Sequence, residues 1–212
     1  MNKKITALLL AGAMVLALAA CGGSGSASKP ADKSPAAPST SASAPAGEAS
    51  GLTEAFAESP ILVASGGQSA DYQMIGTVMG KIGMDYTVNN LATSADLGDA
   101  KTLIVVVGGS SKGLGAAGID ADGELARLNE LIDGAKSAGL SVIAMHTGGE
   151  ARRGELSDKF ITPIFEKADY AIVVAAGDED GLMAGICANA GIPMDSIASI
   201  SEVTTVLPAA FK

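Results

Sequence analysis

Four glycine-rich segments hold the side chains best suited to bind or transform a ligand. They contain Lys112, the only histidine of the chain, His146, and the adjacent pair Arg152 and Arg153. A histidine exchanges protons near neutral pH, and lysine or arginine side chains hold phosphate, sulfate or carboxylate groups. The four segments are residues 65–69, 108–119, 146–154 and 176–181.

The second segment matches a dinucleotide-binding pattern. Gly109, Gly113 and Gly115 have the G-x-x-x-G-x-G spacing of short-chain dehydrogenases, in which glycines let the backbone approach a pyrophosphate. Those enzymes also need a tyrosine followed four residues later by a lysine, and no tyrosine of this chain is followed in that way. We therefore expect no nicotinamide or other cofactor.

The same segment also contains a nucleophile-elbow pattern. Residues 109–113 read G-x-S-x-G, which would make Ser111 a hydrolase nucleophile and His146 its base. A helix must begin directly after such a serine, whereas the glycines at 113, 115 and 118 predict a later start. An extracytoplasmic hydrolase that uses His146 with Ser111 or Glu150 is kept as an alternative. The Walker phosphate-binding pattern fails, because Gly113 stands where it needs serine or threonine.

Two further interpretations of this segment stay open. Consecutive glycine and serine amides, together with Lys112, resemble a backbone nest that binds phosphate, sulfate or carboxylate. The glycines can equally serve turn geometry alone.

The segment that begins at His146 leaves the same choice. At the end of a strand, this histidine can act as an acid or base beside Glu150, while Arg152 clamps an anion. Alternatively, the backbone satisfies the histidine, and the two arginines pair with Glu150, Glu155 or Asp158.

These loops together define an expected ligand-binding site. No metal site is expected, since one histidine without a cysteine cluster makes no structural zinc site, and residues 178–180 fit the solvated start of a helix. The residues expected to bind the ligand are Gly67, Gln68, Ser69, Gly109, Ser110, Ser111, Lys112, Gly113, His146, Gly148, Glu150, Arg152 and Arg153.

Short apolar runs and segments of helical periodicity alternate along the part of the chain that must position these loops. The clearest strand is 102–107, a β-branched run without polar alternation, typical of a parallel strand buried on both faces. Further strands are expected at 61–64, 84–88, 141–145, 170–174 and 197–200. Helices are expected at 69–81 with Ser69 as the N-cap, at 122–138, around 156–165 with Pro163 interrupting or restarting it, at 182–190, and from 202.

Five or six βα units of this kind predict a doubly wound α/β fold. Right-handed crossovers place helices on both faces of a mainly parallel sheet, as in Rossmann-like or flavodoxin-like three-layer sandwiches. The pattern does not determine the strand order. In such sheets ligands bind beyond the carboxyl ends of the strands, which is where the four glycine-rich segments fall.

The charge of the predicted domain argues against some partners. The chain has 14 basic and 23 acidic residues, of which four basic and two acidic ones precede residue 54. The remaining 10 basic and 21 acidic residues give residues 54–212 a net charge of −11. We therefore expect no nucleic acid and no direct adsorption to anionic lipid.

The amino terminus predicts export and lipidation. Lys3 and Lys4 precede an apolar run from Ile5 to Leu18 that is too short for a permanent membrane span. Residues 18–21, Leu-Ala-Ala-Cys, resemble the lipobox of bacterial lipoprotein signal peptides, in which the cysteine carries fatty acyl chains such as palmitate. We expect residues 1–20 to be the signal peptide and Cys21 to be the lipidated residue.

The segment after the cysteine predicts a tether. Residues 22–53 consist almost entirely of glycine, serine, alanine, proline and threonine, which have little to bury. We expect the lipidated cysteine and tether over residues 21–53 and one α/β domain over 54–212. The expected location is the cell envelope, on the outer face of the cytoplasmic membrane, or on the outer membrane in a Gram-negative organism.

Two long blocks, residues 107–118 and 145–154, resemble a family of exported bacterial proteins known as domain of unknown function 6305. The resemblance extends over about residues 60–207. It implies no activity, substrate or site.

These features together predict a lipid-anchored domain that captures a small anionic solute for a membrane transporter or sensor. The bilayer, reached through acylated Cys21, is one expected partner. Catalysis is not favoured. Besides the hydrolase, an envelope protein-interaction domain is the other alternative.

Overall fold

A sheet of parallel strands organises the part of the chain that the computed structural model describes, residues 51–212. Its six strands follow the order β2-β1-β3-β4-β5-β6, and every neighbouring pair is parallel. The strands are β1 (Ile61–Gly66), β2 (Tyr86–Val88), β3 (Thr102–Val107), β4 (Ser141–His146), β5 (Tyr170–Val174) and β6 (Met194–Ile197). The predicted signal peptide, Cys21 and the tether up to residue 50 lie outside the described residues.

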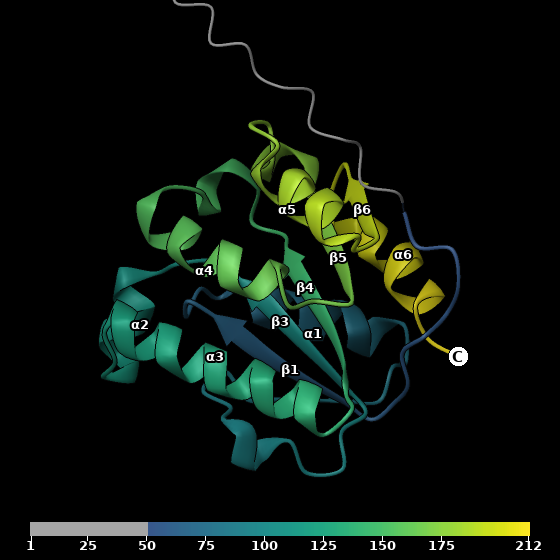
Figure 1. Cartoon of the computed structure of the whole chain (residues 1–212), viewed down its shortest axis with the longest axis horizontal. Coiled ribbons are helices and arrows are strands. Elements are labelled where there is room, and N and C mark those ends of the chain that lie inside the picture. Colours follow the sequence, from purple (N-terminus) through teal and green to yellow (C-terminus); the bar gives the residue numbers. More distant parts are fainter. Residues whose placement is uncertain (1–50) are drawn as a thin grey trace, which may run out of the picture. The chain divides into compact units, whose positions relative to one another are not determined.

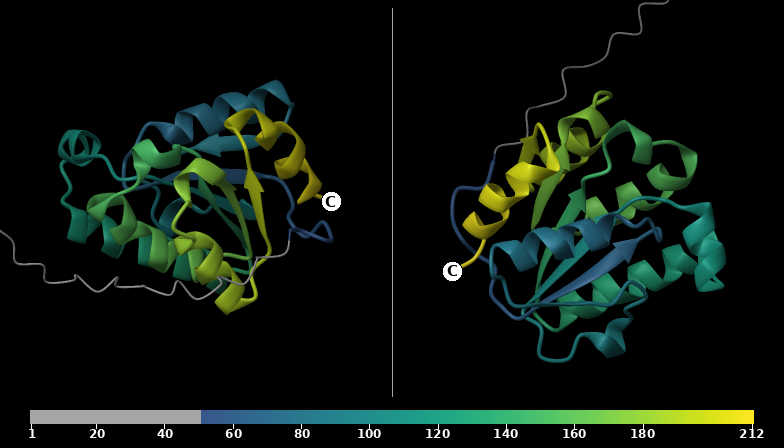
Figure 2. Two further views of the ribbon diagram at one scale, coloured as in Figure 1. Left: turned by 90° about the horizontal axis from the view of Figure 1, so that it is seen from above. Right: turned by 180° about the vertical axis from the view of Figure 1, so that it is seen from behind.

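Helices cover both faces of the sheet. One face carries α1 (Asp71–Lys81) and α6 (Val203–Ala209) (Figure 2). The other carries α3 (Ala121–Ser137), α4 (Glu155–Phe165) and α5 (Leu182–Ala190) (Figure 1). The predicted three-layer α/β fold is therefore confirmed. The order 2-1-3-4-5, extended here by β6, is the flavodoxin-like arrangement.

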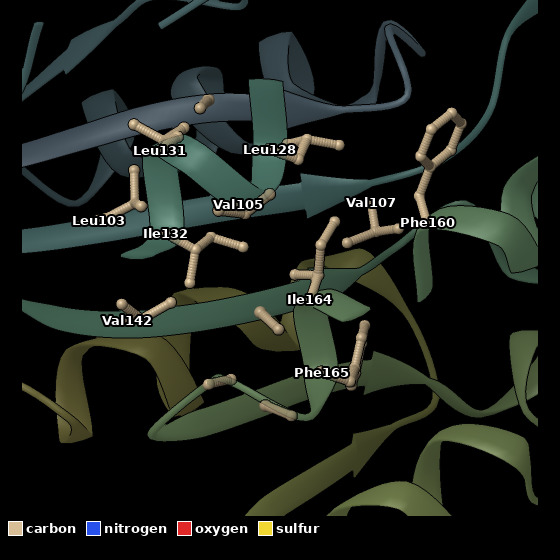
Figure 3. Close-up of a cluster of buried hydrophobic side chains, with 14 of the residues drawn as sticks. Leu103, Val105, Val107, Leu128, Leu131, Ile132, Val142, Phe160, Ile164 and Phe165 are labelled. Atoms are coloured by element: carbon tan, nitrogen blue, oxygen red, sulfur yellow. The ribbon is translucent and has the colours of Figure 1, made fainter. Parts of the chain in front are cut away.

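Two apolar clusters form the core, one on each face of the sheet. Because successive side chains of a strand point to opposite faces, Leu103, Val105 and Val107 of β3 pack toward α3 and α4, whereas Ile104 and Val106 pack toward α1. Figure 3 shows the first cluster, in which side chains of α3 and α4 lie over β3 and β4. Every residue of β3 is buried, as its unbroken β-branched run predicts.

The short helix α2 (Ser111–Ala117) was missed by the sequence analysis, which placed these residues in a loop. The Oγ of Ser110 accepts a hydrogen bond from the backbone N–H of Gly113 at 3.0 Å and so caps the helix. The prediction that glycines delay the helix was therefore wrong. Gly113 lies inside α2 because a Cβ there would come within 1.9 Å of the Gln68 carbonyl oxygen.

Smaller differences concern where elements begin and end. Ala70, not Ser69, is the N-cap of α1, and the Ser69 side chain bonds to Asp71 instead. β6 ends at Ile197, where the sequence analysis expected that strand to begin. Pro163 lies inside α4 without interrupting it. Within residues 51–212, no helix has the length and apolar character needed to span a bilayer.

Candidate ligand-binding crevice

A crevice opens where the chain leaves β1 and β3 in opposite directions. The chain continues from β1 to α1 on one face, and from β3 to α2 and α3 on the other side of the sheet. Ligands of open parallel sheets bind at such a switch point. A cavity of about 340 Å³ lies there, lined by Gln68, Ser69, Ala70, Tyr72, Gln73, Asn90, Leu91, Gly113, Ala116 and Ala117.

Gln68 forms the floor of the crevice in a left-handed backbone conformation, with φ of 62°. Its Nε2 donates to the carbonyl of Asn90 at 3.0 Å and to Oε1 of Glu124 at 3.1 Å, while its Oε1 accepts from Nδ2 of Asn90 at 2.9 Å. A non-glycine residue pays a conformational cost there. These three bonds offset that cost and join the loop after β1 to the loop after β2.

A buried ion pair supports this floor from below. Glu124 is 0% exposed and Arg127 8% exposed, and their side chains meet at 2.7 Å on the inner face of α3. Oε1 of Glu124 also accepts the backbone N–H of Gly67 at 2.9 Å. Arg127 donates to the carbonyls of Ser65 and Ala92. The pair thus connects the end of β1, the segment after β2 and α3.

A second carboxylate ties three loops together at the same edge. Oδ2 of Asp71 accepts from the Oγ of Ser69 at 2.9 Å and from Nε of Arg152 at 3.0 Å. Gly108 and Gly148 permit this approach, because a Cβ at either position would lie 3.0 Å or less from the same oxygen. Nε of Arg152 is therefore bound by the protein, and Arg152 does not line the crevice.

His146 is buried at the end of β4, with 0% of its surface exposed. Its Nε2 lies 3.0 Å from the carbonyl of Arg152, so the ring donates from this nitrogen. Nδ1 has no hydrogen-bond partner within residues 51–212. Burial lowers the pKa of His146 below its ordinary value, outweighing the bond to Arg152 and the nearby Asp71 and Asp178. The ring is therefore neutral near pH 7.

Arg153 joins two acidic segments. Its guanidinium bonds to Asp158 of α4 at 2.9 Å and to Asp180 at 2.8 Å, and it also donates to the carbonyl of Gly177. The hydrogen bond from Arg153 lowers the pKa of Asp180 to about 2. Arg153 and Glu150 line a separate, acidic cavity of about 290 Å³ that also contains Asp158 and Asp180. This arrangement matches the interpretation in which the arginine pairs with carboxylates.

The structure divides the predicted ligand-binding residues into three groups. Those in the crevice are Gln68, Ser69 and Gly113. Those that hold the loops around it are Gly67, Gly109, Ser110, His146, Gly148 and Arg152. Those that line neither its floor nor its walls are Ser111 and Lys112, which are exposed on α2, and Glu150 and Arg153 in the acidic cavity.

The serine–histidine pair of the hydrolase alternative is not formed within residues 51–212. The one hydrogen bond of the His146 ring goes to the Arg152 carbonyl, and Ser111 lies exposed at the start of α2. A general base must reach the proton that it removes. Glu150 is likewise exposed and makes no hydrogen bond to the ring within the described residues. This geometry gives neither form of the hydrolase mechanism an activated nucleophile.

Seven crevice residues and the ion pair beneath them were not predicted from the sequence. Asn90 and Leu91 follow β2, whose loop is not glycine-rich and was not among the four segments. Glu124 had a detectable signal, since it lies four residues before Leu128 on the apolar face of α3. A charged residue in such a stripe indicates a buried partner. The remaining five are Ala70, Tyr72, Gln73, Ala116 and Ala117, which belong to α1, its N-cap and α2.

Other reactive groups of residues 51–212 offer no clear chemistry. No group of three or more histidine, cysteine, aspartate or glutamate residues in this range is arranged to hold a metal ion. Cys187 is buried, and burial raises the pKa of its thiol to about 11. The thiol therefore stays protonated and poorly nucleophilic.

Fold and crevice define a flavodoxin-like α/β domain with a cavity of ligand size at its switch point. The chain belongs to the family called domain of unknown function 6305 (DUF6305), whose model matches residues 58–211. This match confirms the resemblance noted in the sequence. A search of curated proteins found no match.

Two solved structures share weak likeness with the chain. One is a psychrotrophic esterase, EstA, from Pseudoalteromonas sp., inhibited by monoethylphosphonate, with 12% identity and a TM-score of 0.30 over 65% of this chain and 76% of the esterase. The other is TesA, with 14% identity and a TM-score of 0.29 over 64% of this chain and 77% of TesA. At these scores, neither likeness carries an argument about function.

Replacing Glu124 tests the support of the crevice. The Glu124→Gln variant leaves Arg127 buried without a counter-charge, so we expect its free energy of unfolding to fall by about 3–5 kcal/mol. Glu130→Gln, on the exposed side of the same helix, should unfold close to wild type. Urea denaturation measures both. Equal stabilities of the two variants would show that the buried pair supports nothing.

Acid stability tests the neutral state of His146. Its pKa is lowered in the folded chain, so the unfolded chain binds more protons and stability falls as pH drops below the ordinary histidine value. A His146→Gln variant, whose amide also donates to Arg152, should lose less stability over this range. The slopes of unfolding free energy against pH for wild type and His146→Gln should differ by at most about 1.4 kcal/mol per pH unit. Parallel curves of unfolding free energy from pH 7.5 to 5 would contradict this.

Proposed function

We propose that this protein is a lipid-tethered domain that binds a small polar solute in the switch-point crevice. The cavity of about 340 Å³ is the observation that carries the proposal. Ligand pockets generally measure about 300–1,000 Å³ and lie at the switch points of such sheets. Its position and volume support binding, and the absence of an activated nucleophile near His146 within residues 51–212 supports binding without catalysis.

The rigid surroundings of the crevice support the same conclusion. Gln68 is fixed by Asn90 and Glu124, and the loop after β1 is fixed by the buried pair of Glu124 and Arg127. A preformed site loses little conformational entropy when a ligand binds. The floor of this crevice therefore needs no reorganisation before it can hold a small molecule.

The polarity of the crevice changes the ligand that the sequence analysis favoured. None of the residues that line it is charged. Of the basic residues expected to hold an anion, Arg152 and Arg153 are bonded to Asp71, Asp158 and Asp180. The other one, Lys112, is exposed on α2 and does not line the crevice. These contacts leave little reason to retain a small anion as the preferred solute, and we broaden the proposal to polar solutes.

The location of the domain rests on the sequence. The basic start, the apolar run and the Leu-Ala-Ala-Cys motif at 18–21 support export and lipidation at Cys21. Two or more acyl chains anchor a protein stably to a bilayer. A solute-binding domain held there would serve a transporter or sensor in the same membrane, which is the cellular role that we propose.

A cavity-filling variant tests ligand binding. Ala117 lines the crevice from α2, so Ala117→Leu should reduce its volume, whereas Ala126→Leu adds the same side chain on the exposed face of α3. A thermal-shift panel of neutral, anionic and cationic metabolites should include ligands that raise the melting temperature of wild type and Ala126→Leu, but not of Ala117→Leu. Stabilisation that is equal in all three proteins would place binding elsewhere.

Fractionation of cells tests the anchor. The Cys21→Ser variant lacks the thiol that lipidation requires, so the protein should leave the washed membrane fraction and appear in the soluble envelope fraction. A Ser24→Ala variant, changed three residues further on, should stay with the membranes. Membrane retention of Cys21→Ser in its processed form would refute lipidation at this residue.

A further inference from the structure

We propose that the crevice takes an uncharged, hydroxyl-bearing ligand about the size of a monosaccharide, and that Tyr72, Gln73 and Asn90 select it. This inference rests on the proposed function, because it assigns a chemical class to the same cavity. It departs from the anion that the glycine-rich loops suggested. Three properties of the lining carry it: unused hydrogen-bonding groups, absence of charge, and one apolar wall.

Three lining side chains keep hydrogen-bonding capacity. Within residues 51–212, Asn90 uses one N–H of its side-chain amide, toward Gln68, and its Oδ1 has no partner. Gln73 uses one N–H toward the Tyr72 oxygen at 3.1 Å, and its Oε1 has no partner among the described residues. The phenolic hydrogen of Tyr72 is also not donated in the described part of the chain. Donors and acceptors therefore stand next to each other on two amides and a phenol.

That combination suits hydroxyl groups. A hydroxyl both donates and accepts a hydrogen bond, so a ring with neighbouring hydroxyls can engage the donor and the acceptor of one amide together. A carboxylate or phosphate only accepts, and would face Oδ1 of Asn90 and Oε1 of Gln73 without a hydrogen to share. The amides therefore match a neutral hydroxylated ring better than an anion.

The charges around the crevice also disfavour an ion. The charged side chains that bond to lining residues, Asp71 and Glu124, are already paired with Arg152 and Arg127. Lys112 is exposed on α2 and does not line the cavity. A ligand ion would exchange its hydration for neutral dipoles alone, which is costly. The net charge of −11 over residues 54–212 further repels anions at low ionic strength.

The rest of the lining supplies an apolar wall. Leu91, Ala116 and Ala117 line the same cavity as the Tyr72 ring. A pyranose has an apolar face of C–H groups as well as a rim of hydroxyls, so it can use both kinds of surface. A nucleobase would need aromatic or guanidinium planes on its faces, and Tyr72 is the only aromatic lining residue. The volume lies near the lower limit for ligand pockets, which favours one sugar ring.

Calorimetric titration of the purified full chain tests the class of ligand. The neutral probes are glucose, galactose, mannose and N-acetylglucosamine, and the charged probes of similar size are glucuronate, glucose 6-phosphate and glucosamine. We expect at least one neutral sugar to bind. The affinity of its charged counterparts should be lower by a factor of about ten or more. The Ala117→Leu variant should lose this binding, and Ala126→Leu should keep it.

Changes at Gln73 test how the ligand is selected. Gln73 is exposed at the start of α1, so its replacement should leave the fold intact. Gln73→Lys places a cation at the crevice, and the affinity ratio of glucuronate to glucose should rise by roughly threefold or more. Gln73→Met, the uncharged control, should weaken glucose binding without favouring glucuronate. An unchanged ratio in Gln73→Lys would overturn the assigned role.

The outcomes separate this inference from the proposed function. If charged probes bind as well as neutral ones and Ala117→Leu abolishes both, the crevice is a binding site but the assigned class is wrong. If none of the neutral sugars binds, the assigned class is also wrong, and the wider thermal-shift panel decides the proposed function. If sugars bind equally to wild type and Ala117→Leu, both proposals fail.

Discussion

The buried pair of Glu124 and Arg127 is the interaction on which the crevice depends. A carboxylate with no exposed surface is tolerated only where its charge and its oxygens are fully satisfied. Here the partners are Arg127, the amide of Gly67 and the side chain of Gln68, which belong to α3 and to the loop after β1. Arg127 in turn binds the carbonyls at the end of β1 and after β2. Removing either charge would release several loops together, so the pair fixes the site as one unit.

The sequence predicted those features whose cause is local. The strand at 102–107 and the helix at 182–190 were placed with their observed bounds, since an unbroken apolar run and a helical period are properties of adjacent residues. Strand order depends on contacts between distant segments, and no local pattern encodes it. The same limit explains α2. Its glycines looked like a loop, yet Gly113 is there because the carbonyl of Gln68, 45 positions earlier in the chain, leaves no room for a Cβ.

In the candidate site, the difference between features set by adjacent residues and features set by distant segments is larger still. Residue types indicated four of the loops that gather at the carboxyl edge of the sheet, where parallel strands bring their ends together, but not the loop after β2. They did not indicate what each charge would face. Arg152 meets Asp71 across 81 positions of sequence, and Arg153 meets Asp180 across 27. Of the alternatives left open for these arginines, the structure has the one in which they pair with carboxylates. Asn90 was passed over because its importance depends on β2 being the neighbour of β1.

Charge satisfaction also separates scaffold from ligand surface in this domain. The groups that hold the loops, such as Asp71 and Glu124, have bonding partners within the protein, whereas the crevice amides of Gln73 and Asn90 keep part of their hydrogen-bonding capacity unused. The crevice lies between β1 and β3, while the first described residues lie against the other end of the sheet, where Phe56 and Ala57 bond to Ala210 after α6. The first described residues, 51–57, therefore take no part in lining the crevice.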